Sequence, residues 1–423
     1  MTMQPWFAEA KLGIFVHWGI YAVDGVPESW SFFGGDLSRE TYMKQLKGFT
    51  ASRYRPEDWA RLFVRAGAKY AVLTTKHHDG VALWDTARTD LSVAGHSPAA
   101  RDLVGPFTEA LRRHGLRVGL YFSHSDWSHP DYPTIRPSVL QRPWVDNRFA
   151  MPAPGQEEPE RWERFLEQVH RGQIRELLSR YRPDLLWFDG AWERDERQWR
   201  MKELRAEILK LRPRTVLNGR MLGYGDYATP ELGVPILPPE GPWELCYTIG
   251  DAWGHQPGDT AHKSVPELVR VFAETIGHGG NLLLNTGPRE DGTIQPDHAE
   301  RLEGLGQWIR RNHEAVYATD RGMPYGHHYG PSMLARDRRT LFLVCFDPPR
   351  GFVEVRGLRN NVRKISVLGT GEELSHRVVG GFPSHRIPGV VRIEAPTLCD
   401  PQATVLALEL DGEIELYRGQ GAG

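Results

Sequence analysis

The stretch Leu185-Leu186-Trp187-Phe188-Asp189-Gly190 is a short apolar run that ends on a carboxylate followed by a glycine. Packing alone is a poor explanation for a carboxylate at the end of a buried strand. Six other short apolar runs also stop at polar or aromatic residues, and the full set is 13–18, 70–75, 117–123, 185–188, 215–217, 244–248 and 281–284. A parallel barrel builds its active site from side chains at the ends of successive strands. The pattern therefore predicts an enzyme.

Helix-like stretches alternate with these runs from residue 11 to about residue 315. One of them, residues 56–66, places Trp59, Leu62 and Phe63 on one face, as an amphipathic helix does. Such alternation predicts an α/β fold with a parallel sheet, here a (β/α) TIM-like barrel. Because seven strands are clear rather than eight, an irregular barrel is as well supported as a regular one. An open doubly wound sheet is the weaker alternative, since no glycine-rich phosphate turn follows the first strand.

The pattern changes after about residue 330. Short runs rich in β-branched residues follow one another, separated by Gly, Asp and Pro, which is typical of an antiparallel β-sandwich. We therefore expect a catalytic barrel domain over residues 1–325 and a C-terminal β-sandwich domain over residues 326–423. No catalytic constellation occurs in the second part, so we expect it to have a stabilising role. Residues 128–159 are expected to form a long loop over the strand ends.

Composition excludes several classes of function. The formal net charge of −2 is not that of a polybasic nucleic-acid-binding protein. No apolar run approaches the roughly 18 to 20 residues that cross a bilayer, and the first residues lack the pattern of a secretory signal. The three cysteines are far apart, so no disulfide framework is expected. For the sequence as it stands we expect a cytoplasmic protein that binds neither nucleic acid nor membrane.

Tryptophan is unusually plentiful, with 14 residues. Several stand beside the polar strand ends, among them Trp18, Trp84, Trp127, Trp187 and Trp253. Any single one is well explained as a filler of the core. Aromatic faces also pack on the C–H surface of sugars, and a sugar site needs such faces together with convergent hydrogen-bonding groups. Collectively these residues favour a carbohydrate site.

Asp189 is the first candidate for chemistry. An isolated aspartate at a strand end can simply cap the next helix or pair with an arginine. Here it stands beside Trp187, and a carboxylate nucleophile with a nearby acid is the arrangement of retaining glycosidases. Arg220 follows Asn218-Gly219 and is either a surface charge or an ion-pair partner that keeps Asp189 ionised. The residues leave both interpretations of Arg220 open.

The sequence His77-His78-Asp79 raises the question of a metal site. Adjacent residues on an extended segment point to opposite sides, so both imidazoles cannot easily bind one ion. No further set of histidines and aspartates has the spacing of metal ligands. We therefore expect no metal and no other cofactor, and we expect His77, His78 and His17 to hydrogen-bond to sugar hydroxyl groups.

These motifs together resemble the α-L-fucosidases of glycoside hydrolase family 29. The similar segments occur in the order 13–19, 76–80, 121–123, 186–190, 218–220 and 279–288. The resemblance extends over about residues 5–315, and the family also implies a C-terminal β-sandwich. It therefore concerns nearly the whole chain.

The resemblance implies a retaining exo-α-L-fucosidase that acts on terminal α-L-fucosyl groups of an oligosaccharide or glycoconjugate. Asp189 would be the nucleophile that forms a fucosyl-enzyme intermediate. The residues implied to line the fucose pocket are His17, Trp30, His77, His78, Tyr121, Trp187, Arg220 and Trp253. Stretches 226–231 and 250–255 are similar to the subgroup that cleaves α-1,3 and α-1,4 linkages.

Two glutamates match the acid/base positions of different subgroups. Glu231 closes stretch 226–231 and is similar to the bacterial pattern, whereas Glu244 is similar to the pattern of animal lysosomal members. The acid of a retaining enzyme lies about 5–5.5 Å from the nucleophile. We expect the loop that carries Glu231 to lie on the rim of the strand ends. This position favours Glu231 as the acid/base, with Glu244 as the second candidate. Otherwise Glu231 is a solvated loop carboxylate and Glu244 part of an ion pair at a strand edge.

One position departs from the family pattern. The family commonly has Glu-Trp after the first strand, where its glutamate binds fucose hydroxyl groups, but here Ser29 precedes Trp30 and Glu28 is one residue further away. The departure leaves open the same mechanism on another α-L- or galacto-configured glycoside. A metal-dependent hydrolase and a non-catalytic sugar-binding protein are further alternatives, and the latter would require the loss of Asp189 or of both acid candidates.

Overall fold

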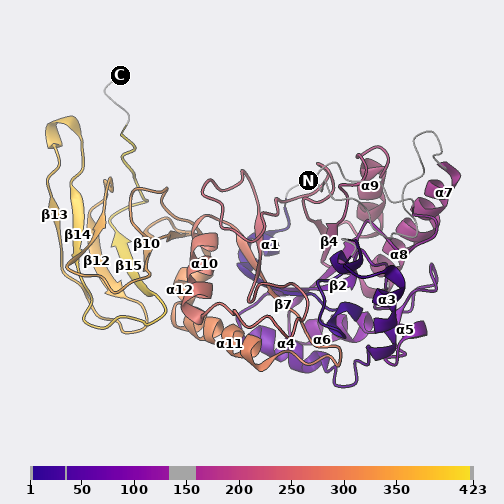
Figure 1. Ribbon diagram of the computed structural model, residues 1–423. Helices are drawn as coiled ribbons and strands as arrows, with labels where there is room; N and C mark the ends of the chain where they lie inside the picture. Colours follow the sequence, from indigo (N-terminus) through magenta and orange to yellow (C-terminus); the bar gives the residue numbers. More distant parts are fainter. Residues whose placement is uncertain (1–2, 34–35, 133–158, 420–423) are drawn as a thin grey trace.

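The computed structural model describes residues 3–33, 36–132 and 159–419 (Figure 1). A parallel sheet with its helices forms one end of the molecule, and two antiparallel sheets form the other. The expected loop over residues 128–159 lies almost entirely outside the described residues. No helix in the described ranges is both long and apolar enough to cross a membrane.

The parallel sheet has seven strands in the order β5-β4-β3-β2-β1-β7-β6. Every neighbouring pair in it is parallel, which confirms the α/β class predicted from the sequence. The strands are β1 (Leu12–Val16), β2 (Tyr70–Lys76), β3 (Arg117–Ser123), β4 (Leu185–Asp189), β5 (Val216–Leu217), β6 (Glu244–Thr248) and β7 (Asn281–Thr286).

The seven strands form a half-barrel, and in the described part of the chain no strand ladder joins β5 to β6. Instead, an extended segment, 227–231, lies between them. Tyr227 forms a parallel bridge with Asn218 beside β5, and Ala228 and Glu231 form parallel bridges with Trp243 and Cys246.

Helices connect the strands, as the alternating pattern predicted. Helix α4 begins with Pro56, carries two acidic residues in its first turn and buries Trp59 and Phe63, which suits the start of an amphipathic helix. The helices are α1 (Pro5–Ala10), α2 (Trp30–Phe33), α3 (Arg39–Met43), α4 (Pro56–Arg65), α5 (Val93–His96), α6 (Val104–Arg113), α7 (Pro159–Arg164), α8 (Arg171–Glu176), α9 (Met201–Leu211), α10 (Val265–Gly277), α11 (Pro296–Arg311) and α12 (His313–Val316). Two π-helical turns, Phe165–His170 and Leu177–Tyr181, continue α7 and α8 into one long helical stretch.

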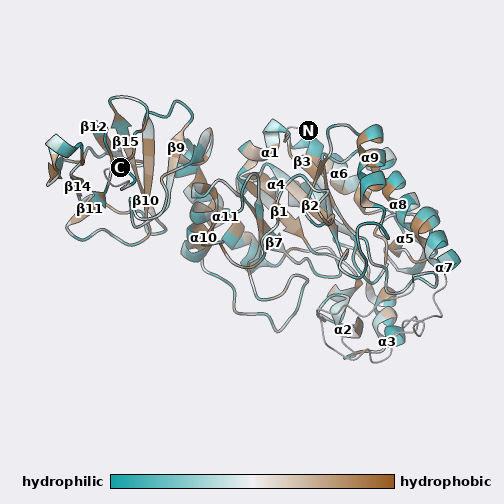
Figure 2. Ribbon diagram, turned by 90° about the horizontal axis from the view of Figure 1, so that it is seen from above, coloured by the Kyte–Doolittle hydropathy of each residue, from teal (hydrophilic) through white to brown (hydrophobic). Residues whose placement is uncertain are grey.

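Alternation along β4 decides which side chains face the inside of the half-barrel. Leu185 and Trp187 belong to the inner cluster, whereas Leu186 and Phe188 pack with the surrounding helices. Since successive side chains of a strand point to opposite faces, Asp189 follows Leu185 and Trp187 on the inner side. Figure 2 shows the apolar strands enclosed by helices whose outer faces are polar.

The C-terminal part consists of two antiparallel sheets, which confirms the antiparallel strands predicted there. The first contains β8 (Thr319–Arg321), β9 (Ser332–Ala335), β10 (Thr340–Cys345), β12 (Val362–Val367) and β15 (Thr404–Leu410), and the second contains β11 (Phe352–Val355), β13 (His376–Val379) and β14 (Val390–Glu394). Apolar side chains of both sheets, such as Leu406 and Ile393, pack in one cluster. Strand β8 precedes residue 326, so the five-stranded sheet begins before the expected domain boundary.

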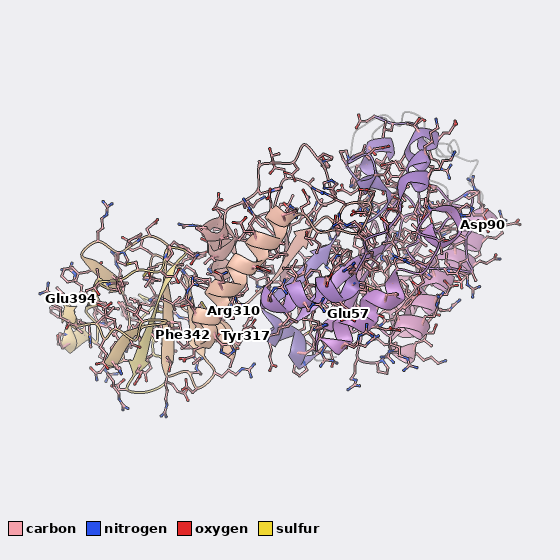
Figure 3. The ribbon with its side chains drawn as sticks, turned by 90° about the horizontal axis from the view of Figure 1, so that it is seen from below. Glu57, Asp90, Arg310, Tyr317, Phe342 and Glu394 are labelled. Atoms are coloured by element: carbon pink, nitrogen blue, oxygen red, sulfur yellow. The ribbon has the colours of Figure 1, made fainter. Side chains whose placement is uncertain are left out.

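The five-stranded sheet is joined to the helices of the parallel part by a continuous core. Phe342 on β10 belongs to the same apolar cluster as Phe272 on α10 and Trp308 on α11. The indole N–H of Trp308 donates to the carbonyl of Ala403 at 2.8 Å in this buried contact. Figure 3 labels Phe342 on the sheet side of this boundary and Arg310 and Tyr317 on the helical side.

Candidate active site

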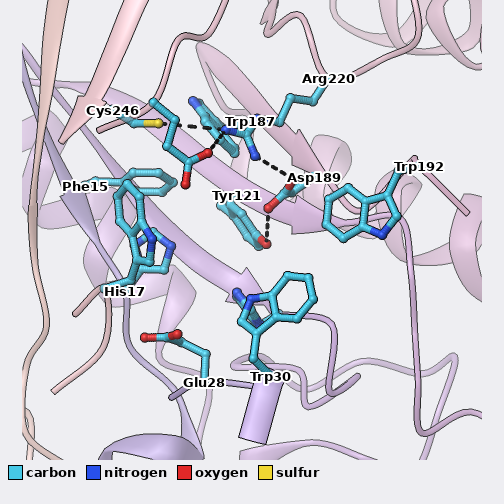
Figure 4. A pocket seen from close by; sticks show the side chains of 13 residues that line it. Phe15, His17, Glu28, Trp30, Tyr121, Trp187, Asp189, Trp192, Arg220 and Cys246 are labelled. Atoms are coloured by element: carbon cyan, nitrogen blue, oxygen red, sulfur yellow. Dashed lines mark hydrogen bonds and ion pairs between the residues drawn. The ribbon is translucent and has the colours of Figure 1, made fainter. Parts of the chain in front are cut away.

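A pocket of about 390 Å³ opens at the carboxyl ends of the parallel strands (Figure 4). Its volume is within the range of small-molecule sites, roughly 300–1,000 Å³. The pocket is lined by Phe15, His17, Glu28, Trp30, His77, Tyr121, Trp187, Asp189, Trp192, Arg220, Glu231, Cys246 and Trp253. All the residues implied by the family resemblance line it except His78 and Glu244.

Asp189 lies at the base of this pocket, where two side chains donate hydrogen bonds to it and a third lies close by. The Tyr121 hydroxyl donates to Asp189 Oδ2 at 3.1 Å, and Arg220 Nη1 donates to Oδ1 at 2.9 Å. His78 lies behind the carboxylate, with Nε2 3.7 Å from Oδ2. The ion pair with Arg220 and the hydrogen bond from Tyr121 thus fix the orientation of the Asp189 carboxylate.

The backbone at the end of β4 is fixed on both sides of Asp189. The Asn218 side chain accepts from the N–H of Phe188 at 2.8 Å and donates to its carbonyl at 2.9 Å. Gly190 has a φ of +74°, and a Cβ there would lie 2.9–3.0 Å from side-chain atoms of Ser125, His78 and Ser123. A glycine is required at this position because both the backbone conformation and the space exclude a larger residue.

Arg220 forms ion pairs with two carboxylates. Its Nη1 binds Asp189, and its Nη2 binds Oε2 of Glu231 (Figure 4). The guanidinium also lies over the Trp187 ring, 4.7 Å from the ring centroid. Of the two interpretations left open by the sequence, the structure therefore shows the ion pair with Asp189.

The pocket histidines are neutral at neutral pH. Burial lowers the pKa of His17 to about 4 and lowers the pKa of His77 and of His78 well below the usual value for histidine. His17 Nδ1 lies 2.7 Å from Asn285 Oδ1, and His78 Nδ1 lies 2.6 Å from Ser123 Oγ. Neutral imidazoles are suited to hydrogen bonding with sugar hydroxyl groups.

The arrangement of these histidines also bears on the possibility of a metal site. Within the described ranges, no group of three or more His, Cys, Asp or Glu side chains is arranged to hold a metal ion. The Nδ1 atoms of His77 and His78 are each occupied by a serine hydroxyl group. The imidazoles are therefore organised for hydrogen bonding.

Aromatic rings form much of the pocket wall. Trp187 and Tyr121 are stacked with their centroids 5.6 Å apart, and the ring of Phe15 lies 5.0 Å from Trp187. Trp30 and Trp192 are nearly parallel, with an interplanar angle of 16° at 5.9 Å. These faces fit the apolar surface of a sugar ring, as the tryptophan content predicted.

Glu28 reaches inward and lines the pocket, an orientation that the sequence by itself left open (Figure 4). Its Oε1 accepts from the N–H of Gly254 at 2.5 Å, and burial raises its pKa to about 7. Ser29 instead turns to His77. The sequence contains an indication that Glu28 takes the place of the usual family glutamate. One extra residue, Ser29, stands between Glu28 and Trp30 and moves the glutamate back by one position. Phe15, Trp192 and Cys246 are further lining residues that the sequence analysis missed.

Glu244 does not line the pocket. It is fully buried inside the half-barrel, where Oε1 accepts from Trp187 Nε1 at 2.8 Å and from the Tyr227 hydroxyl at 3.2 Å. Its Oε2 accepts from the Tyr70 hydroxyl at 2.5 Å. Burial raises the pKa of Glu244 to about 7, although the three donors oppose the change. Glu244 therefore hydrogen-bonds to Trp187, Tyr70 and Tyr227 inside the half-barrel.

Carboxylates, neutral imidazoles and aromatic walls at the strand ends of a parallel half-barrel define a glycoside hydrolase. Residues 1–314 match the family model described as "Alpha-L-fucosidase". The tissue α-L-fucosidase of Rattus norvegicus is 34% identical over 349 residues, which cover 75% of this chain and 70% of that protein. The chain belongs to the α-L-fucosidase family, glycoside hydrolase family 29, as the sequence motifs indicated.

Solved structures agree with this assignment. α-L-Fucosidase isoenzyme 1 from Paenibacillus thiaminolyticus is 30% identical, with a TM-score of 0.82, and the match covers 96% of this chain and 98% of that one. A family 29 α-L-fucosidase from Bacteroides thetaiotaomicron, described as a trapped covalent intermediate with 2-fluoro-fucosyl fluoride, is 25% identical with a TM-score of 0.83. That match covers 96% of this chain and 95% of that one. Family, fold and pocket therefore identify an α-L-fucosidase.

Replacing Glu244 with glutamine should mainly affect stability. The buried hydroxyl groups of Tyr70 and Tyr227 would compete for one remaining oxygen, so the free energy of unfolding should fall by about 1–3 kcal/mol. Urea denaturation measures this change, with Glu240→Gln, at an exposed position, as the control. Wild-type stability together with a collapse of turnover would instead place Glu244 in contact with substrate.

Proposed function

We propose that this α-L-fucosidase is a retaining exo-enzyme with Asp189 as its nucleophile. The observation that carries the proposal is the position of Asp189, which pairs with Arg220, accepts from Tyr121 and lines an aromatic pocket. One Asp189 oxygen attacks the anomeric carbon as the bond to the leaving-group oxygen breaks, and this forms a fucosyl ester. Water then attacks the same carbon, which releases fucose and restores the carboxylate. The covalent intermediate described for the Bacteroides enzyme supports the same route.

Glu231 is the proposed acid/base. It donates a proton to the leaving-group oxygen in the first step and accepts one from water in the second. Asp189 and Glu231 bind the same guanidinium of Arg220, which keeps the two carboxyl groups close, and retaining enzymes use a separation of about 5–5.5 Å. Glu231 also lies on the pocket rim, with an exposed side chain that a leaving group can reach.

We infer that segment 227–231 completes the barrel wall between β5 and β6. Its bridges to Asn218, Trp243 and Cys246 support a TIM-like closure made without a regular eighth strand. This closure would carry Glu231 to the pocket rim. The shared apolar cluster of the two C-terminal sheets supports a β-sandwich, and we infer that this domain includes β8 as well as residues 326–423.

The sugar is proposed to be α-L-fucose at the end of an oligosaccharide or glycoconjugate. Phe15 and Trp253 offer an apolar wall, their rings 6.1 Å apart, and this suits the methyl group that fucose carries at carbon 5. Glu28 supplies the carboxylate that the family uses for hydroxyl recognition, although Ser29 holds the usual position. A preference for α-1,3 and α-1,4 linkages is the expectation from stretches 226–231 and 250–255.

Replacing Asp189 with alanine or glycine should lower kcat/KM for an aryl α-L-fucoside by at least about 10³-fold, because the nucleophile is lost. Added azide can occupy the space left by the Asp189 side chain and attack the anomeric carbon from the face that Asp189 would attack. The product should therefore be the β-fucosyl azide, identified by proton NMR. Asp195→Asn, in the loop after the same strand, is the control and should keep activity. Wild-type turnover in either Asp189 variant would refute the assignment.

Replacing Glu231 with alanine should slow both chemical steps when the leaving group is poor. With an aryl fucoside of good leaving group, azide should restore turnover by attacking the fucosyl-enzyme from the opposite face, which yields the α-fucosyl azide. Glu244→Ala should give no azide product. If azide rescues the Glu244 variant and not the Glu231 variant, the two roles are exchanged.

A panel of aryl glycosides tests the sugar. We expect α-L-fucoside to exceed α-L-galactoside in kcat/KM by about tenfold or more, because the additional hydroxyl group would face Phe15 and Trp253 without a partner. Equal rates would favour the wider galacto-configured class. Fucosyl oligosaccharides with α-1,2, α-1,3, α-1,4 and α-1,6 linkages, followed by fucose release, then measure the linkage preference.

A further inference from the structure

Ser29 connects the backbone of the 76–80 turn to a pocket histidine. Its side chain is fully buried, and Oγ accepts from the N–H of Asp79 at 2.8 Å. The same oxygen lies 2.6 Å from His77 Nδ1. These are the two hydrogen bonds of the Ser29 hydroxyl among the described residues, so they determine where its proton points.

The Ser29 hydroxyl group has one proton to donate. The backbone N–H of Asp79 is itself a donor, so it cannot accept that proton. His77 Nδ1 is therefore the acceptor available to the Ser29 proton. If His77 carried its own proton on Nδ1, the buried Ser29 hydroxyl would donate to nothing, and an unmade buried hydrogen bond is costly. Burial also keeps the His77 ring neutral, so its one proton belongs on Nε2.

The other two histidines are held in the opposite tautomer. Asn285 donates through Nδ2 to the carbonyl of Trp253 at 2.7 Å, so its oxygen faces His17 Nδ1 and accepts from it. Ser123 donates its proton to the carbonyl of Ser125 at 2.7 Å, so it accepts from His78 Nδ1. His17 and His78 are left with an unprotonated Nε2.

We propose that Ser29 is a positioning residue that holds His77 as the Nε2–H tautomer, which makes His77 a hydrogen-bond donor to the ligand, whereas His17, the other histidine that lines the pocket, is an acceptor. The proposal rests on the proposed function, in which His77 contacts the fucosyl group. His77 then donates its Nε2–H to a substrate oxygen, whereas His17 accepts the proton of a substrate hydroxyl group at its own Nε2. His77 and His17 thereby distinguish a substrate oxygen that accepts a hydrogen bond from a hydroxyl group that donates one.

The geometry of His77 supports this role. Its ring is stacked on Tyr121 with an interplanar angle of 5° and a centroid distance of 5.6 Å, which fixes the ring plane. His77 lines the pocket, and because Nδ1 is bound to Ser29, Nε2 is the nitrogen left for a ligand. Tyr121 also donates to Asp189, so the orientation of His77 is coupled to the nucleophile.

The tautomer can be read directly in the ligand-free, full-length enzyme. Selective ¹⁵N-histidine labelling separates protonated from unprotonated ring nitrogens by their chemical shifts, and the His77 signals are assigned by their loss in His77→Gln. In the wild type we expect Nε2 protonated and Nδ1 unprotonated for His77. A protonated Nδ1 at pH 7 would overturn the proposal.

Two substitutions change the proton donor in different ways. Ser29→Ala removes it, so both tautomers should be populated and kcat/KM for an aryl α-L-fucoside should fall about twofold to fivefold, in proportion to the competent fraction. Ser29→Asp supplies an acceptor, so His77 should move its proton to Nδ1 and kcat/KM should fall by about tenfold or more. KM should account for most of the change in both variants, since Asp189 is untouched.

Ser31→Ala is the matched control. Ser31 is also buried, lies two residues further along, in helix α2, and donates its side-chain hydrogen bond to the carbonyl of Glu28 at 3.0 Å. Its loss should leave the His77 spectrum unchanged.

A wild-type His77 spectrum in Ser29→Ala overturns the proposal, as does a retained Nε2–H in a folded Ser29→Asp. If Ser29→Asp does not fold, the His77 spectrum of Ser29→Ala alone tests the proposal. The spectrum is recorded without substrate, so it is independent of the substrate panel that tests the proposed function.

Discussion

The parallel pairing of β3 with β4 is the constraint on which the pocket depends. Its register places Tyr121 beside Trp187 and Ser123 beside Asp189. Because side chains alternate along each strand, this register turns Tyr121, Trp187 and Asp189 to the inner side together. A shift of one residue would turn Asp189 towards the surrounding helices and remove its carboxylate from the pocket.

Charge in the pocket is concentrated on one cation and its carboxylate partners. Arg220 binds both Asp189 and Glu231, while the three buried imidazoles are neutral. A buried charge is costly unless it is paired, and this explains why one guanidinium serves two carboxylates. The neutral imidazoles add no further charge to this cluster.

Much of the fold and part of the site were predictable from the sequence. The seven strands follow from short apolar runs, and the polar residues at their ends identified most of the pocket. Glu28 was left open because its orientation depends on how one extra residue is accommodated before Trp30. Glu244 was a plausible acid by position, but β6 turns it inward to Tyr70, Tyr227 and Trp187, contacts between strands far apart in the chain.

Local patterns by themselves determined the order of strands and helices and the family, and they selected Asp189 as a candidate for catalysis. They could do so because periodicity, turn residues and motifs are properties of neighbouring residues. Only the tertiary structure decided that Arg220 joins Asp189 to Glu231, that segment 227–231 lies between β5 and β6, and that Ser29 binds His77. Each of these contacts joins residues whose separation in space is set by strand register and packing. The stretch ending at Asp189 therefore predicted a catalytic candidate, and only the surrounding fold placed its partners beside it.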